Sequence, residues 1–135
     1  MSKATVLLVD DEPKIVETLQ AALEQEGYEV LVAGDGPSCL EAVFRHVPDI
    51  VLLDVMIPGE DGYSVSRKIH EAAESDRLRR KIPVVLLTAR DLSHDPVSEK
   101  VTRKVSHAEL IVYKPFDIDD LLFLVETVLK NARSS

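Results

Sequence analysis

The sequence has little of what marks secreted, membrane-bound or nucleic-acid-binding proteins. Its single cysteine, Cys39, excludes an internal disulfide and a thiolate metal site, and we expect it to pack as a small apolar residue. No apolar run is long enough for a signal peptide or a membrane span, so we expect a reducing, cytoplasmic location. The net charge of −8 argues against nucleic acid as a direct partner.

The chain has the length and composition of one globular domain. It contains 135 residues, 45% of them hydrophobic, without a low-complexity tract, an internal repeat or a linker. We therefore expect a single domain over residues 1–135, with a core from about residue 4 to residue 131.

Short apolar runs alternate with helical patterns along the chain. The runs predict strands at Val6–Val9, Tyr28–Val32, Ile50–Leu53, Pro83–Leu87 and Leu110–Tyr113. Start and stop signals predict five helices, which begin at Pro13, at Pro37, beyond Gly62, near Asp95 and after Asp117. This alternation is typical of an α/β fold, in which a parallel sheet carries helices on both faces.

Polar side chains follow four of the expected strands. Asp10 and Asp11 end the first, Asp54 the third, Thr88 the fourth and Lys114 the fifth. Parallel strands present their carboxyl ends at one edge of the sheet, so these side chains are expected to converge there. Three carboxylates repel one another, and one lysine leaves a charge of about −2 that a divalent cation would neutralise. Oxygen ligands favour Mg²⁺ or Mn²⁺ over zinc.

A cluster of this kind suits phosphoryl transfer to a carboxylate nucleophile. Spacing alone does not decide which aspartate attacks, although the paired acids suit metal binding and the lone Asp54 suits the nucleophile. The histidines lie on separate elements without ligand spacing, and we expect surface positions for all four, which are His46, His70, His94 and His107.

Four short motifs, each at the end of an expected strand, occur in order along the chain. They are Val9–Glu12, Leu53–Pro58 with Asp61–Gly62, Leu87–Arg90 and Lys114–Phe116. Together they resemble the receiver domain of bacterial two-component response regulators, over about residues 4–131. The resemblance implies a flavodoxin-like, doubly wound sheet of five strands with five helices.

The resemblance also implies roles for the acidic residues. Asp54 resembles the phosphoacceptor, and Asp11 the direct Mg²⁺ ligand, with Asp10 acting largely through water. The backbone carbonyl of Met56 would be a further ligand. The chain would then be a phosphoacceptor switch that assists its own phosphorylation and dephosphorylation, rather than a conventional enzyme.

Two further residues match the family at the last two strand ends. Thr88 resembles the hydroxyl that moves to bind the phosphoryl group, and Lys114 the lysine that pairs with it. The Lys114–Pro115 peptide is expected to be cis, as in the family. The implied partners are a histidine kinase or phosphotransfer protein upstream, and a protein partner or a second copy of the chain downstream.

The last expected strand departs from the family pattern. Receivers usually carry Tyr or Phe three residues before the lysine as a rotamer switch, and this chain has Ile111. Tyr113 points to the opposite face from Val112, and we do not expect it to replace that aromatic. The usual Gly-Ala-rich approach to this strand reads Ser106–Glu109. The chemistry looks intact, whereas the signalling route looks unusual.

Three alternatives compete with a phosphorylatable receiver. The departures at Ile111 and in the fourth helix would suit a pseudo-receiver, an interaction module that does not switch by phosphate. A metal-dependent phosphatase of the haloacid dehalogenase type would want an aspartate two residues after its nucleophile, where this chain has Met56. A flavin carrier would want a hydroxyl- and glycine-rich loop in place of Asp11–Pro13.

The final helix carries one aromatic residue on its polar side. At 100° per residue, Phe123 lies about 140° from Ile118 and is expected to face water. We expect Phe123 to anchor a contact on the face formed by the fourth helix, fifth strand and fifth helix, where receivers meet partners. No effector domain is expected within this chain, so it would act by binding a partner protein or by relaying phosphate.

Overall fold

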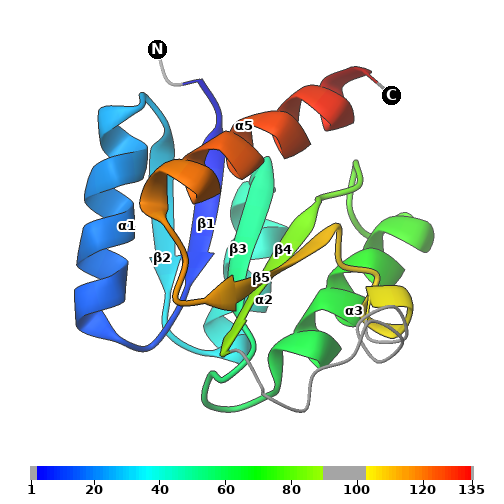
Figure 1. The fold of residues 1–135 in the computed structure, drawn as a ribbon. Coiled ribbons are helices and arrows are strands. Elements are labelled where there is room, and N and C mark those ends of the chain that lie inside the picture. Colours follow the sequence, from blue (N-terminus) through cyan, green and yellow to red (C-terminus); the bar gives the residue numbers. More distant parts are fainter. Residues whose placement is uncertain (1–2, 90–102, 135) are drawn as a thin grey trace.

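The computed structural model describes residues 3–89 and 103–134 and places five parallel strands in one sheet (Figure 1). The strands are β1 (Thr5–Val9), β2 (Glu29–Ala33), β3 (Ile50–Asp54), β4 (Val84–Ala89) and β5 (Leu110–Lys114). Their order across the sheet is β2-β1-β3-β4-β5, so β3 is the central strand. All five expected strands are confirmed, and so is the flavodoxin-like, doubly wound topology.

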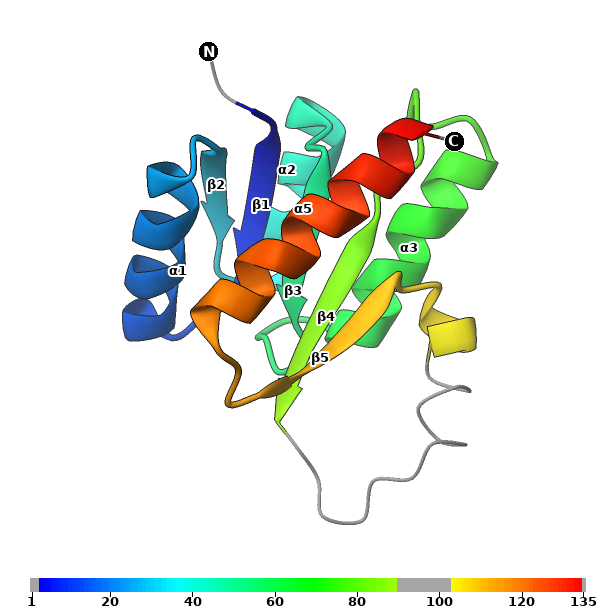
Figure 2. The same cartoon turned by 45° about the horizontal axis from the view of Figure 1, so that its top comes forward.

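Helices cover both faces of the sheet. They are α1 (Pro13–Gln25), α2 (Gly36–His46), α3 (Gly62–Glu74) and α5 (Ile118–Ser134), together with the helical residues 103–106. Helices α1 and α5 lie on one face and α2 and α3 on the other (Figures 1 and 2). The expected start of the fourth helix near Asp95 lies outside the described residues. In residues 3–89 and 103–134, no helix is long and apolar enough to cross a bilayer.

The sheet separates two apolar cores because successive strand residues point to opposite faces. In β3, Val51 and Leu53 belong to the core beneath α2 and α3, whereas Ile50 and Leu52 belong to the core beneath α1 and α5. Every residue of β3 is buried. This burial on both faces explains why the strand reads as an unbroken apolar run that ends on a carboxylate.

Aspartate side chains cap three of the helices. Asp35 accepts the Ser38 N–H before α2 at 2.7 Å, and Asp61 accepts the Ser64 N–H before α3 at 2.9 Å. At α5, Asp117 accepts the backbone N–H groups of the two residues that follow Ile118. These caps satisfy N–H groups that have no partner within the helix, so the loops end at defined residues.

Helix α5 buries one stripe against the sheet, as its repeat predicts, and the buried residues are Leu121, Val125, Val128 and Leu129. Phe123 is 68% exposed, which confirms that it faces water. However, it lines a hollow with Glu26, which follows α1, and Tyr28, which precedes β2. Phe123 therefore faces the β2 edge of the sheet, and its expected place on the face with β5 and the fourth helix is wrong.

Candidate metal centre

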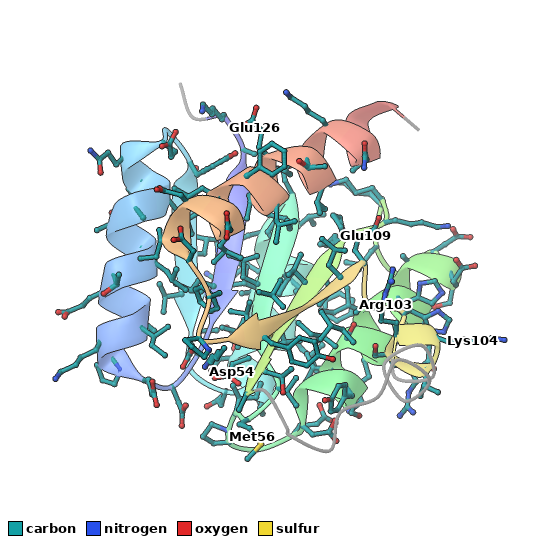
Figure 3. The ribbon with its side chains drawn as sticks, in the orientation of Figure 1. Asp54, Met56, Arg103, Lys104, Glu109 and Glu126 are labelled. Atoms are coloured by element: carbon teal, nitrogen blue, oxygen red, sulfur yellow. The ribbon has the colours of Figure 1, made fainter. Side chains whose placement is uncertain are left out.

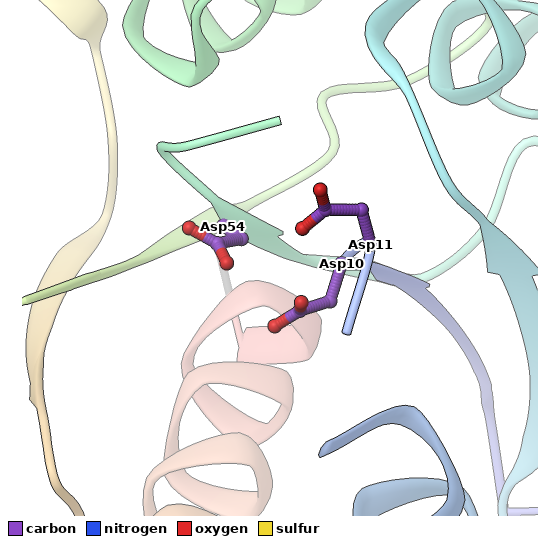
Figure 4. Close-up of side chains that lie close together, drawn as sticks. All are labelled: Asp10, Asp11 and Asp54. Carbon is purple, nitrogen blue, oxygen red and sulfur yellow. The ribbon is translucent and has the colours of Figure 1, made fainter. Parts of the chain in front are cut away.

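Three carboxylates meet at the carboxyl edge of the sheet (Figure 4). Oxygen atoms of Asp10, Asp11 and Asp54 all lie within 4.8 Å of one another. Asp10 directly follows β1 and Asp54 ends β3, and these strands are neighbours in the sheet. Asp10 is 2% and Asp54 5% exposed, whereas Asp11 is exposed. The sheet thus brings together the acids that the sequence places at separate strand ends.

The surroundings of Asp10 disfavour its negatively charged form. Burial raises its pKa above the ordinary value, and the charge of Asp54 acts in the same direction. The Glu12 N–H, 2.9 Å from Oδ1, and the Lys114 ammonium, 3.4 Å from Oδ2, oppose this rise without cancelling it. One lysine therefore leaves part of the carboxylate repulsion unrelieved.

Asp54 has a different partner on each oxygen. Oδ1 accepts the Met56 backbone N–H at 2.8 Å, and Oδ2 accepts Lys114 Nζ at 2.9 Å. The pKa of Lys114 is raised: burial works against its charged form, but the hydrogen bond to Asp54 and the charges of Asp10 and Asp54 outweigh burial. The ammonium consequently stays charged beside the Asp54 carboxylate at neutral pH.

Helix α3 begins in direct contact with the segment that carries Asp54. Gly62, the first residue of α3, donates its N–H to the Val55 carbonyl at 3.0 Å. A Cβ atom on Gly62 would lie 2.7 Å from Val55 Cα and 2.9 Å from the Asp54 carbonyl oxygen. Only glycine permits this approach, so the Asp-Gly motif seats α3 against the acidic residue.

The remaining candidate residues lie at the same edge. Met56 follows Asp54 in the loop, with an exposed side chain and its N–H bound to Asp54. Thr88 lies near the end of β4, next to Leu87, which pairs in register with Asp54. The Lys114–Pro115 peptide bond is cis, as expected. Ile111 packs into the core beneath α2 and α3, where an aromatic switch would have stood.

The donor set fits a hard divalent cation. It consists of carboxylate oxygens, two buried and one exposed, with three negative charges facing one lysine. Oxygen ligands of this kind hold Mg²⁺ through few protein contacts while the ion keeps several waters. Asp11, which is exposed, can turn toward an ion, and the charge of Asp54 adds to burial in raising the pKa of Asp10.

An apolar hollow of about 480 Å³ lies beside Lys114, between α1 and the start of α5. It is lined by Lys14, Ile15, Thr18, Leu19, Lys114, Pro115, Phe116 and Ile118. The sequence did not predict this hollow, because Ile15 and Leu19 read as part of the buried stripe of α1. The only sequence signal is Phe116, a large aromatic residue directly after the Lys-Pro motif.

Comparison with known proteins agrees with this geometry. The family model of the response regulator receiver domain matches residues 6–126. The chain is 36% identical over 126 residues to the probable transcriptional regulatory protein TcrX of Mycobacterium tuberculosis, covering 93% of this chain and 50% of TcrX. It is 38% identical over 130 residues to the uncharacterized transcriptional regulatory protein YkoG of Bacillus subtilis, covering 96% of this chain and 53% of YkoG.

A solved structure, the receiver domain of the Francisella response regulator 1452, superimposes with a TM-score of 0.81 at 27% identity, covering 96% of this chain and 98% of the other. The chain belongs to the receiver domain family of two-component response regulators. It spans about half the length of the curated relatives that it matches.

Proposed function

We propose that this receiver accepts a phosphoryl group on Asp54 in a Mg²⁺-dependent reaction and signals through protein contacts. The observation that carries the proposal is the arrangement of Asp54, whose buried carboxylate lies between the Lys114 ammonium and two further acids. The phosphoryl donor is a histidine kinase or a phosphotransfer protein. The chain is a switch that assists its own modification rather than a conventional enzyme.

In the proposed reaction, an oxygen of Asp54 attacks the phosphorus of the donor phosphohistidine. A phosphorus–oxygen bond forms as the phosphorus–nitrogen bond breaks, and the donor imidazole leaves with the electron pair. Once the phosphoryl group is attached to Asp54, the Lys114 ammonium and the Thr88 hydroxyl bind its oxygens. Mg²⁺, held by Asp10, Asp11, Asp54 and the Met56 carbonyl, would supply positive charge for the phosphoryl oxygens.

The apolar hollow beside Lys114 supports a protein as the phosphodonor. The donor histidine has to reach Asp54, and the hollow adjoins the lysine that binds this carboxylate. An amphipathic helix of the donor could place apolar residues against Ile15 and Phe116 while its histidine faces Asp54. Downstream, we propose a protein partner or homodimer on the face formed by the fourth helix, β5 and α5.

The test is phosphorylation by acetyl phosphate with Mg²⁺, followed by intact mass and peptide mapping. The parent gains one phosphoryl group, which maps to Asp54, and Asp54→Asn gains none. Asp76→Asn is the matched control, because Asp76 is an exposed aspartate with φ 61°, a conformation that asparagine tolerates. An Asp54→Asn protein with a phosphoryl group on another residue refutes the assignment. A parent that stays unmodified would instead be a pseudo-receiver.

A further inference from the structure

Helix α3 holds the approach to β5 through two adjacent contacts. Ser66 Oγ donates to the Ser106 carbonyl oxygen at 2.8 Å, and these two residues are 1% and 0% exposed. One helical turn further along α3, the His70 imidazole stacks on that of His107, with ring centroids 3.8 Å apart and planes within 4°. The approach to β5 is therefore fastened by one buried hydrogen bond and one ring contact.

The contacts of Ser106 and His107 with α3 account for the side chains found here in place of the Gly-Ala-rich segment that usually precedes β5 in the family. The Ser106 hydroxyl also accepts the Ala108 N–H at 3.4 Å, which ties the bend locally. His107 has φ 58°, so the backbone turns at this residue before β5 begins. Ser66 and His70 on α3 contact Ser106 and His107 across the fold, and the proposed reaction at Asp54 uses none of the four.

Charged groups surround the histidine pair on every packed element. On α3, Glu74 Oε1 lies 3.7 Å from His70 Nε2, and Lys81 lies 3.6 Å from the same carboxylate oxygen. Arg103 donates to the Glu109 carbonyl at 2.9 Å, and Lys104 lies next to it on the same helical turn (Figure 3).

Two more charged residues face the rings across an adjoining hollow of about 750 Å³. They are Arg80 and Asp49, which pair with each other at 3.0 Å. The hollow beside the rings is thus lined by Arg80, Lys81, Asp49 and Glu109, and Glu74 contacts His70 directly. Glu74, which Lys81 already contacts, can stabilise one added proton on His70. A second proton, on His107, finds less support, because the Asp49 carboxylate is already paired with Arg80.

We propose that the His70–His107 stack is a proton-sensitive contact that fastens residues 103–109 to α3. Neutral imidazole rings gain dispersion energy when they stack, whereas two imidazolium rings at this separation repel. Histidine changes charge between about pH 5 and pH 8, so the contact is closed at pH 8 and opens in mild acid. The proposal does not depend on phosphorylation of Asp54.

A double-mutant cycle tests the contact. His70→Ala, His107→Asn and the double variant are compared with the parent by thermal unfolding at about pH 8 and about pH 5.5. Asparagine is used at position 107 because it tolerates positive φ. At the higher pH, the two single changes should be non-additive by about 3 °C, the size expected for a stacked aromatic pair. At the lower pH, the non-additivity should vanish or change sign.

A matched cycle of Ser66→Ala and Ser106→Ala provides the control, because neither hydroxyl titrates in this range. Its non-additivity should be the same at both pH values. Additive histidine substitutions at about pH 8, or equal coupling at both pH values, would overturn the proposal.

A second measurement uses the unmodified chain, so it does not depend on variants that fold. The NMR ring-proton signals of His70 and His107 should each shift in two steps on acidification, because each ring senses the other's proton. Independent single-step titration of both rings would refute the contact as a proton-sensitive one.

Discussion

Replacing Gly62 with alanine tests how tightly α3 is seated on the segment that carries Asp54. The added methyl carbon would lie 2.7 Å from Val55 Cα, 2.9 Å from the Asp54 carbonyl oxygen and 3.3 Å from the Val55 nitrogen. All three are backbone atoms, so no side chain can rotate away to relieve the overlap. Either the start of α3 moves outward or the Asp54–Val55 backbone shifts.

The cost can be estimated from opposing effects. Overpacking of this kind costs about 1–3 kcal/mol, and the upper half applies because backbone atoms must move. Alanine restricts the unfolded chain, which returns about 0.4–1 kcal/mol. The net loss is about 1–2.6 kcal/mol in the free energy of unfolding, which lowers the Tm of a domain of this size by about 4–9 °C.

Gly34→Ala is the matched control, because no atom lies within 4 Å of the position that its Cβ would take. Urea unfolding of the two variants should separate them, with Gly34→Ala within about 0.5 kcal/mol of the parent. Gly62→Ala should also accept phosphate from acetyl phosphate about tenfold more slowly, because Asp54 is displaced. Gly62→Ala and Gly34→Ala proteins of equal stability would refute the reasoning.

Three further predictions concern separate sites. Mg²⁺ should raise the Tm of the parent but not of Asp11→Ala. Without metal, Asp11→Ala can be more stable than the parent, because one repelling charge is gone. An undiminished Mg²⁺ response in this variant would place the metal site elsewhere. Burial, with a smaller contribution from Asp35, raises the pKa of Cys39 to about 12. Iodoacetamide at neutral pH should therefore alkylate Cys39 far faster in urea than in the native protein, as followed by mass spectrometry; equal rates would contradict its burial. Phe123→Ala should cost less than about 1 kcal/mol in urea unfolding and leave Asp54 phosphorylation unchanged, because this ring is mostly exposed; a loss of several kcal/mol would mean that the ring is buried.

The acidic cluster was predictable because it follows from topology alone. A run of apolar residues that ends on a polar one predicts a buried strand with a functional end, and parallel strands align those ends. Asp10, Asp54 and Lys114 lie far apart in the chain, yet the strand order brings them within hydrogen-bond distance. No detail of side-chain packing was needed for this part of the site.

Contacts between the flanks of neighbouring elements were not predictable in the same way. The helical repeat gives the angle of Phe123 and therefore its exposure, but not which neighbour flanks it. The tilt of α5 decides that, and it turns Phe123 toward Tyr28 at the β2 edge. The hollow beside Lys114 was missed for a similar reason. Apolar residues at helical spacing give the same sequence pattern whether they are buried in the core or line a groove.

Helix α3 shows both situations within one element. Its first residue, Gly62, packs on the Asp54 segment, and this contact is encoded locally by the Asp-Gly motif. Further along the helix, Ser66 and His70, which are one helical turn apart, contact Ser106 and His107. The spacing of Ser66 and His70 cannot be interpreted from the sequence, because the residues that they contact lie about forty positions further along the chain. The chemistry at Asp54 is therefore written in short motifs, while the contact that anchors β5 depends on the register between distant elements.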